Sequence, residues 1–217
     1  ASHQKYFQAR ADGFYNDHVE AVSFDDYKAR LDHDELPRAN TTAQSLAQLK
    51  TVYGSPTVTP GNAPGLDTGA TALLLSTRTG TEERGLEPLG IIRGLASLAC
   101  APREIAVAPG LVIKKLARSL DWNPEKVDAL EVNEAFAAVP LVSAKCLADG
   151  DKSREQKILK RMNPRGGAVA LGHPTGASGA RLVLQLIKEL RSRGGGKGIA
   201  AICGALGQAD AVAVVVR

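Results

Sequence analysis

We expect an α/β fold, because short apolar runs rich in β-branched residues alternate with helical patterns from Thr71 to the end of the chain. Strands that alternate with helices indicate a sheet layer covered by helices. The runs that predict strands lie at residues 71–77, 89–97, 129–133, 167–171, 198–203 and 211–216. The last five predict one five-stranded mixed sheet between Pro88 and Arg217. Its final two strands are joined by only a short turn, which indicates an antiparallel pair.

Three segments between these strands have the pattern of helices: residues 109–122, 134–148 and 179–193. The third has its apolar residues on one side, at Leu182, Leu186, Ile187 and Leu190. It ends before Gly194, a residue type that commonly terminates helices, and Ser178 is expected to cap its first turn.

The composition indicates an ordinary globular chain of 217 residues, 44% hydrophobic and 23% charged. No apolar run reaches about 18 residues and no signal-peptide pattern opens the sequence, so we expect no membrane span and a cytoplasmic protein. Cys100, Cys146 and Cys203 are far apart and lack metal-ligand spacing, which favours a reducing compartment. The net charge of +4 favours an anionic ligand, but Lys and Arg are interspersed with Asp and Glu, so we expect no nucleic-acid partner.

The most informative stretch is residues 166–181, GGAVALGHPTGASGAR, which places His173 on a glycine-rich turn before a helix. Glycines allow tight turns and close backbone approach, and Pro174 stiffens the bend after the histidine. A catalytic imidazole is often presented in this way. The alternative is a turn histidine that is bonded only to the backbone.

Two further motifs accompany this turn: Asn133-Glu134-Ala135-Phe136 upstream and Cys203-Gly204-Ala205-Leu206-Gly207-Gln208 downstream. Together the three motifs resemble the C-terminal half of a thiolase, an acyl-CoA acyltransferase. The resemblance covers almost all of the chain. It implies that residues 1–65 are a remnant of the loop and CoA-binding region, residues 66–87 the last strand and helix of the N-terminal half, and residues 88–217 the C-terminal domain.

Thiolases are about twice this length, and their first half carries the nucleophilic cysteine. No residue of this sequence matches that cysteine, and the first residue is Ala1 rather than Met. We therefore expect a fragment or a processed chain that is inactive by itself and lacks a partner N-terminal half.

The resemblance implies a catalytic role for three residues. His173 would activate the nucleophilic cysteine and contribute to an oxyanion site. Cys203 would be the acid–base group at the α-carbon of the acetyl unit. Asn133 would hold a water in the first oxyanion site, with a helix N-cap as the alternative role. Acyl transfer that makes or breaks a C–C bond beside a thioester requires groups of these kinds.

Six further residues are implied as substrate contacts. Arg38 and Ser45 match loop positions that meet the nucleotide end of CoA, with a solvated surface as the alternative. Ala135 and Phe136 would line the pantetheine channel, although a helical phenylalanine can also belong simply to the core. The remaining two expected contacts are Ala63 and Gly207.

Two positions depart from the thiolase pattern. Pro64 stands where many members have serine, so a hydroxyl contact to pantetheine is lost and the loop is stiffer. Ala205 stands in place of the glycine of the usual Cys-x-Gly, which restricts the backbone beside Cys203.

We expect ping-pong acyl transfer, either thiolysis of a 3-ketoacyl-CoA or the reverse Claisen condensation. CoA would be a substrate, and no metal or redox cofactor is expected. The intact enzyme would be a homodimer or homotetramer of fatty acid metabolism, acting in β-oxidation. Two alternatives come from other classes: a non-catalytic CoA-binding or scaffold subunit, and a ketosynthase-like condensing enzyme that acts on a carrier protein. Cys203 argues against the second, because such enzymes usually place a histidine there.

Overall fold

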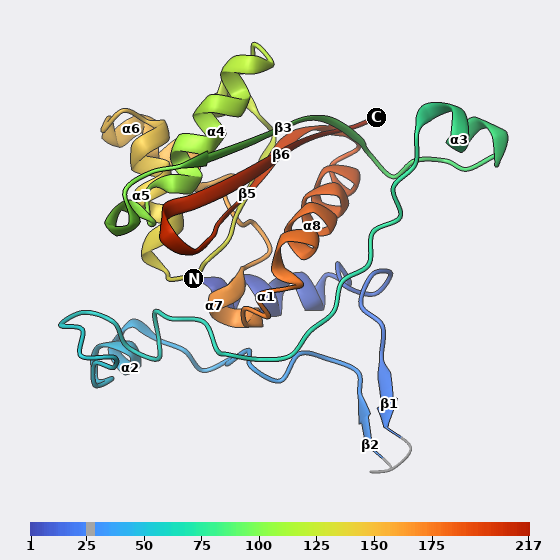
Figure 1. The fold of residues 1–217 in the computed structure, drawn as a ribbon. Helices are drawn as coiled ribbons and strands as arrows, with labels where there is room; N and C mark the ends of the chain where they lie inside the picture. Colours follow the sequence, from blue (N-terminus) through green and yellow to red (C-terminus); the bar gives the residue numbers. More distant parts are fainter. Residues whose placement is uncertain (25–28) are drawn as a thin grey trace.

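The computed structural model describes residues 1–24 and 29–217. A four-stranded mixed sheet lies at its centre, with helices on both faces, and the N-terminal third of the chain passes along one end of this layer (Figure 1). The strand order is β3 (Ile91–Ala99), β6 (Gln208–Val216), β5 (Gly196–Cys203) and β4 (Ala129–Val132). β6 is antiparallel to both of its neighbours, and β4 is parallel to β5. The predicted mixed α/β layer and its antiparallel final pair are confirmed.

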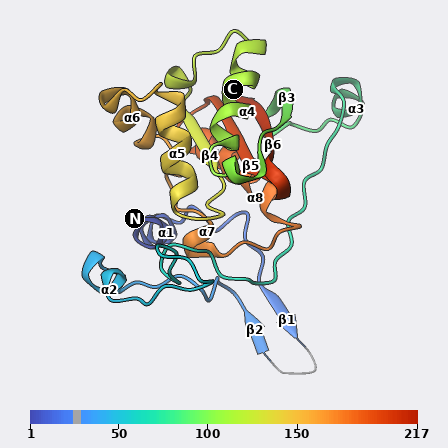
Figure 2. The same ribbon diagram turned by 60° about the vertical axis from the view of Figure 1, so that its left-hand side comes forward.

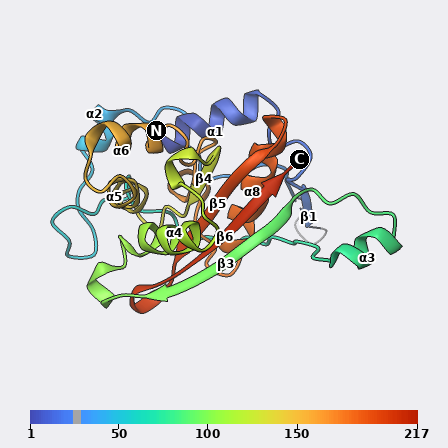
Figure 3. The same ribbon diagram turned by 90° about the horizontal axis from the view of Figure 1, so that it is seen from above.

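The two faces of the sheet bury separate hydrophobic cores. Helices α4 (Ala108–Ser119) and α5 (Ala138–Leu147) cover one face, and α6 (Lys152–Leu159) lies beside α5 (Figure 3). Helix α8 (Ser178–Ser192) covers the other face. Because side chains alternate along a strand, Ile199 of β5 packs in the first core and Ala200 in the second.

The N-terminal third of the chain packs at the end of the sheet where the carboxyl ends of β4 and β5 lie. Helix α1 (Ser2–Ala11) packs on the short helix α7 (Ala168–Leu171) through buried Tyr6. The Lys5 ammonium donates hydrogen bonds to the carbonyl oxygens of Met162 and Asn163 at 3.1 and 2.8 Å. β1 (Val22–Phe24) and β2 (Ala29–Leu31) form a small antiparallel pair that projects from the body, with α2 (Ala43–Ala47) on another side (Figure 2).

Three short 3₁₀ turns connect these elements: η2 (Pro102–Glu104), η3 (Pro124–Lys126) and η4 (Ala205–Gly207). Within the described ranges, no helix combines the length and apolar character needed to cross a membrane.

The prediction of a fifth strand at residues 167–171 is wrong, because this segment forms helix α7. The Glu134 carboxylate accepts a hydrogen bond from the backbone N–H of Val169 at 2.9 Å, and this contact satisfies a donor of the first helical turn. A short apolar run does not distinguish a buried strand from a buried helical turn, so a contact made by a residue 35 positions away decided the outcome.

Beside β4, where the fifth strand was expected, the chain forms only one isolated parallel bridge, between Leu130 and Met162, among the residues that the structure describes. Asn163 ends this pairing because its backbone turns to φ 47°. Its side-chain amide then accepts from the Val132 N–H and donates to the Val132 carbonyl, both at 2.8 Å. A side chain thus replaces the backbone of a fifth strand along β4.

The strand expected at residues 71–77 is also not formed. The segment is irregular, with Leu74 and Leu75 exposed to 88% and 70%. A strand needs a neighbour to pair with its backbone groups, and in residues 1–24 and 29–217 no strand pairs with this segment. The following helix, α3 (Arg78–Glu83), does form.

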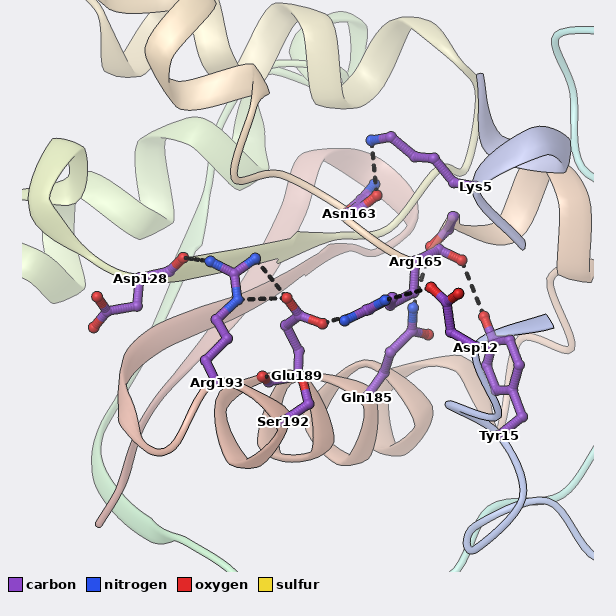
Figure 4. A network of polar contacts seen from close by, with 11 residues as sticks. Lys5, Asp12, Tyr15, Asp128, Asn163, Arg165, Gln185, Glu189, Ser192 and Arg193 are labelled. Atoms are coloured by element: carbon purple, nitrogen blue, oxygen red, sulfur yellow. Dashed lines mark hydrogen bonds and ion pairs between the residues drawn. The ribbon is translucent and has the colours of Figure 1, made fainter. Parts of the chain in front are cut away.

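A buried ion network connects α8 to the rest of the molecule (Figure 4). Glu189, only 1% exposed, accepts from Arg165 Nε at 2.6 Å and from Arg193 Nε at 2.5 Å. Arg165 also lies 3.7 Å from the carboxylate of Asp12, just beyond α1, and Arg193 donates to the Asp128 carbonyl at 3.1 Å. One carboxylate therefore helps to join α8, the N-terminal segment and the start of β4.

We expect Glu189→Ala to lower the free energy of unfolding by about 1–3 kcal/mol, because Arg165 and Arg193 lose charge-assisted hydrogen bonds but remain partly solvated, with side chains 24% and 39% exposed. Urea unfolding followed by circular dichroism measures the change. Lys152→Ala is the control: its side chain is 79% exposed, so its loss should change the same quantity by no more than about 0.5 kcal/mol. Equal losses in both variants would contradict the importance of the network.

Candidate active site

Asn133 and His173 meet at the carboxyl edge of the parallel pair β4 and β5. Asn133 directly follows β4, and its N–H donates to the carbonyl of Ala201 in β5 at 2.9 Å. His173 lies in the turn between α7 and α8, with Nε2 3.1 Å from Asn133 Nδ2. Cys203 is the last residue of β5, so it ends at this same edge. The structure thus brings two of the predicted catalytic residues into contact and places the third on the neighbouring strand.

Ser178 orients the imidazole of His173. Its Oγ lies 2.7 Å from His173 Nδ1 and 3.0 Å from the Pro174 carbonyl. The single hydroxyl proton goes to the carbonyl, which can only accept, so Oγ accepts from Nδ1–H. The Asn133 amide then donates to Nε2, and these partners assign the lone pair of the ring to Nε2.

The predicted capping role of Ser178 is therefore wrong. Ala177 occupies the N-cap position, and Ser178 is the first residue of α8. The hydroxyl is fully buried and is engaged by the histidine five residues earlier. A serine one turn after a candidate catalytic histidine was the sequence signal for this contact.

The predicted helix over residues 134–148 begins later than expected, at Ala138, so Asn133 does not cap it. Asn133 has no exposed surface, and its Oδ1 has no hydrogen-bond partner among the residues that the structure describes. Buried polar atoms are normally paired, so this oxygen is an acceptor that remains available at the site.

Glu134 anchors the histidine turn rather than reaching the imidazole. One carboxylate oxygen accepts from Ser2 Oγ at 2.5 Å and the other from the Val169 N–H at 2.9 Å. Gly167 is required beside it, because a Cβ there would lie 2.6 Å from the Glu134 carboxyl carbon. The close approach holds α7, and with it His173, against the end of β4.

Asp67 also touches this turn and was not identified from the sequence. Its Oδ2 lies so close to Gly172, which has φ 90°, that a Cβ on Gly172 would be 1.7 Å away. Nearby, the His173 N–H donates to the Gly65 carbonyl at 3.2 Å. Asp67 is more than a hundred positions from His173, and no local pattern marks it.

The environment favours a neutral base and a neutral acid. Burial lowers the pKa of His173, Arg181 lowers it further, and Asp67 raises it. Burial raises the pKa of Cys203. At neutral pH the imidazole is therefore unprotonated and able to accept a proton, whereas the Cys203 thiol retains a proton that it can donate.

A groove of about 540 Å³ leads toward the histidine turn. Arg38, Ser45 and Ala63 line it, as expected for one binding surface, and Gly65 and Val169 lie at the end joined to the turn. Further lining residues are His3, Leu36, Tyr53 and Pro64.

Two of these groove residues also have structural contacts. The Ser45 hydroxyl closes a capping box with Thr42 at the start of α2. The backbone N–H of Arg38 donates to His3 Nδ1 at 3.1 Å, while its side chain is exposed.

The other three predicted contacts lie apart from this groove. Ala135 packs against the core of the α4 and α5 face, and Phe136 is 42% exposed after the end of β4. Gly207 is buried against Cys100, whose backbone N–H donates to the Gly207 carbonyl at 3.0 Å.

Comparison with known proteins decides the family. Residues 86–216 match the thiolase C-terminal domain, and residues 1–79 match the thiolase N-terminal domain. The chain belongs to the thiolase family.

The beta-ketoadipyl-CoA thiolase of Pseudomonas aeruginosa shares 40% sequence identity with this chain. The match covers 98% of this chain and 52% of that relative. The crystal structure of the Bacillus anthracis acetyl-CoA acetyltransferase has a TM-score of 0.90 at 36% identity, over 100% of this chain and 54% of its own. The crystal structure of human mitochondrial 3-ketoacyl-CoA thiolase in complex with CoA has a TM-score of 0.86 at 30% identity. The match covers 100% of this chain and 52% of the human chain. The thiolase-like fold is confirmed, and the chain spans about half the length of these thiolases.

The loop after Cys203 has a strained backbone. η4 contains Ala205, and the next residue, Leu206, has φ 60° and ψ 30°. This left-handed conformation costs a non-glycine residue about 1–2 kcal/mol. Gly207 follows at φ 80°, and a Cβ there would lie 2.5 Å from the Cys100 carbonyl oxygen. Close packing on Cys100 therefore holds a strained loop directly beside Cys203.

We expect the Cys203 thiol to react with iodoacetamide with a pH midpoint above that of a free cysteine, which is about 8.5. The thiolate is the reactive form, and burial raises the pKa of this group, so less thiolate is present at neutral pH. Alkylation rates from pH 6 to 11 in a Cys100→Ser/Cys146→Ser variant measure the midpoint. A cysteine-containing peptide is the control, and a midpoint below that of the peptide would contradict the assignment.

Proposed function

We propose that this chain supplies the CoA groove, the base and the acid–base thiol of a thiolase. The hydrogen-bonded series Asn133, His173 and Ser178 carries the proposal, because it presents the Nε2 lone pair at the edge where Cys203 ends its strand. In this proposal residues 1–65 form the loop and CoA-binding region, residues 66–87 complete the N-terminal half, and residues 88–217 are the C-terminal domain.

The reaction that fits these groups is thiolysis of a 3-ketoacyl-CoA. His173 Nε2 exchanges its hydrogen bond from Asn133 for the proton of the nucleophilic cysteine, which comes from the other half of the enzyme. The thiolate bonds to C3, the C2–C3 bond breaks, and its electron pair remains on C2 of the departing acetyl-CoA. Cys203 protonates C2. Asn133 and the protonated His173 stabilise the oxyanion that forms on the attacked carbonyl.

The second half of the cycle returns every proton. The CoA thiol gives its proton to the Cys203 thiolate and bonds to the acyl carbon, the enzyme thioester breaks, and the nucleophilic thiolate recovers its proton from His173. In the reverse direction Cys203 removes the C2 proton from acetyl-CoA, and the Claisen condensation follows.

The groove suits the CoA portion of such a substrate. Its volume of about 540 Å³ lies in the usual range for small-molecule sites. The exposed Arg38 side chain provides a positive charge for the phosphates, and the end near Gly65 and Val169 directs a thioester toward His173. In the intact enzyme Ala135, Phe136 and Gly207 would line the inner part of the channel, where the other half completes it.

The names of the relatives favour an acyl-CoA acetyltransferase as the intact enzyme. We propose in addition that it is a homodimer or homotetramer of fatty acid metabolism and acts in the cytoplasm. One alternative is a non-catalytic CoA-binding or scaffold subunit. This chain would then bind CoA but never complete an acyl-transfer cycle with a complementary half.

The chain should bind CoA in isothermal titration calorimetry, and Arg38→Ala should weaken that binding roughly tenfold or more, the usual effect of losing a charged contact. Binding of pantetheine, which has no phosphates, should be nearly unaffected by the same change. Arg78→Ala, on the exposed helix α3, is the control. If CoA does not bind, or if Arg38→Ala affects both ligands equally, the groove assignment is wrong.

We expect His173→Ala and Cys203→Ala to stop different steps when the chain is combined with a thiolase N-terminal half. Without the base, the nucleophilic thiol stays largely protonated, so His173→Ala abolishes acylation. Cys203→Ala still permits acylation from an acyl-CoA, because the CoA group can leave as a thiolate, but it slows proton transfer at C2 by roughly 10²–10⁴-fold. Rapid-quench measurement of the acyl-enzyme separates the steps. Equal loss of acylation in both variants would refute the separate roles.

A further inference from the structure

Two guanidinium nitrogens of the half-buried Arg181 are shielded from solvent near the histidine turn, and Arg181 forms no ion pair with any residue that the structure describes. Arg181 lies one helical turn after Ser178 on α8, and Nη1 donates to Gln185 Oε1 at 2.8 Å. Its Nε and Nη2 are buried and have no hydrogen-bond partner in the described part of the chain. Burying a charge in this way is costly unless it is compensated, so the uncompensated charge needs a reason.

The acidic groups around Arg181 cancel its charge only in part. Glu131 faces it from β4 and is fully buried with both oxygens unpaired among the described residues, and burial raises the pKa of Glu131 to about 8. Glu131 is therefore mostly protonated at neutral pH. Asp34 and Asp67 also lie near Arg181, and burial raises the pKa of each.

Asp67 contacts the histidine turn from a different element. Its Oδ2 lies against the backbone of Gly172, immediately before His173, and its Oδ1 is buried without a partner among residues 1–24 and 29–217. Asp67 belongs to the irregular segment that leaves the groove, so this segment and α8 approach the turn separately.

Two charged groups of opposite sign therefore face His173. Asp67, from the segment after the groove, lies against Gly172, and Arg181 lies on α8 one turn after Ser178, which bonds His173 Nδ1. Asn133 and Ser178, its hydrogen-bond partners, are uncharged, and Cys203 at the end of β5 is a neutral thiol. Glu134 is engaged by Ser2 and Val169.

We propose that Asp67 and Arg181 are opposed positioning residues of His173: Asp67 anchors the turn through Gly172 and brings a negative charge to it, whereas Arg181, one helical turn after Ser178, brings a positive charge. Neither residue touches the reacting atoms. A base must be unprotonated to accept a proton, so Arg181 increases the fraction of His173 that can act. The inference rests on the proposed role of His173 as a base, but its test does not depend on catalysis.

The test is an NMR titration of the four histidines in the 217-residue chain, with the His173 signal assigned by its loss in His173→Gln. Arg181→Gln should raise the pKa of His173, and Arg181→Lys, which keeps the charge, should stay near the original value. Asp67→Asn should lower it. Arg191→Gln, an exposed change on the same helix, is the matched control and should have no effect.

Opposite shifts in the two neutral variants support the inference. A lowered or unchanged pKa in Arg181→Gln overturns it, and so does an Arg181→Lys variant that behaves like Arg181→Gln. If Arg181→Gln does not fold, Asp67→Asn decides alone: a lowered pKa supports the inference, and an unchanged or raised one overturns it. Failure of the unmodified chain to bind CoA would refute the proposed function and leave these titrations valid.

Discussion

The hydrogen bond between Asn133 and His173 is the contact on which the candidate site depends. It joins the end of the edge strand β4 to the turn before α8, two parts of the chain that are 40 positions apart. Ser178 fixes the opposite side of the ring, so the imidazole has one tautomer and one orientation. An imidazole held at both nitrogens loses little further freedom when it reacts, which is the physical advantage of a preorganised base.

Buried polar groups, rather than apolar packing, position this turn. Glu134 holds α7 through Val169 and α1 through Ser2, and Asn163 replaces a missing strand with its side-chain amide. Each of these groups loses water on burial and must recover its hydrogen bonds within the protein. A network of this kind tolerates few arrangements, so it specifies the geometry of the turn more sharply than a hydrophobic contact would.

The strands β3, β4, β5 and β6 could be predicted because each has enough apolar and β-branched residues to indicate its own state. The segment 167–171 could not, because its five small and apolar residues suit a strand or a helical turn equally well. Glu134 resolved the choice by capping the helix from a distant loop. Residues 71–77 have a strand pattern, but pairing depends on a neighbour and not on the segment itself.

The sequence by itself determined the family, the α/β layer and the candidate residues Asn133, His173 and Cys203. Each of these residues lies in a short local motif that can be recognised from its glycines and neighbouring residues. Only the tertiary structure decided how these residues are oriented and which charges surround them. Asp67 and Arg181 have no local signal, since an electrostatic field depends on distances in space. The same reason explains why Arg38, Ser45 and Ala63 share one groove, whereas Ala135, Phe136 and Gly207 lie outside it.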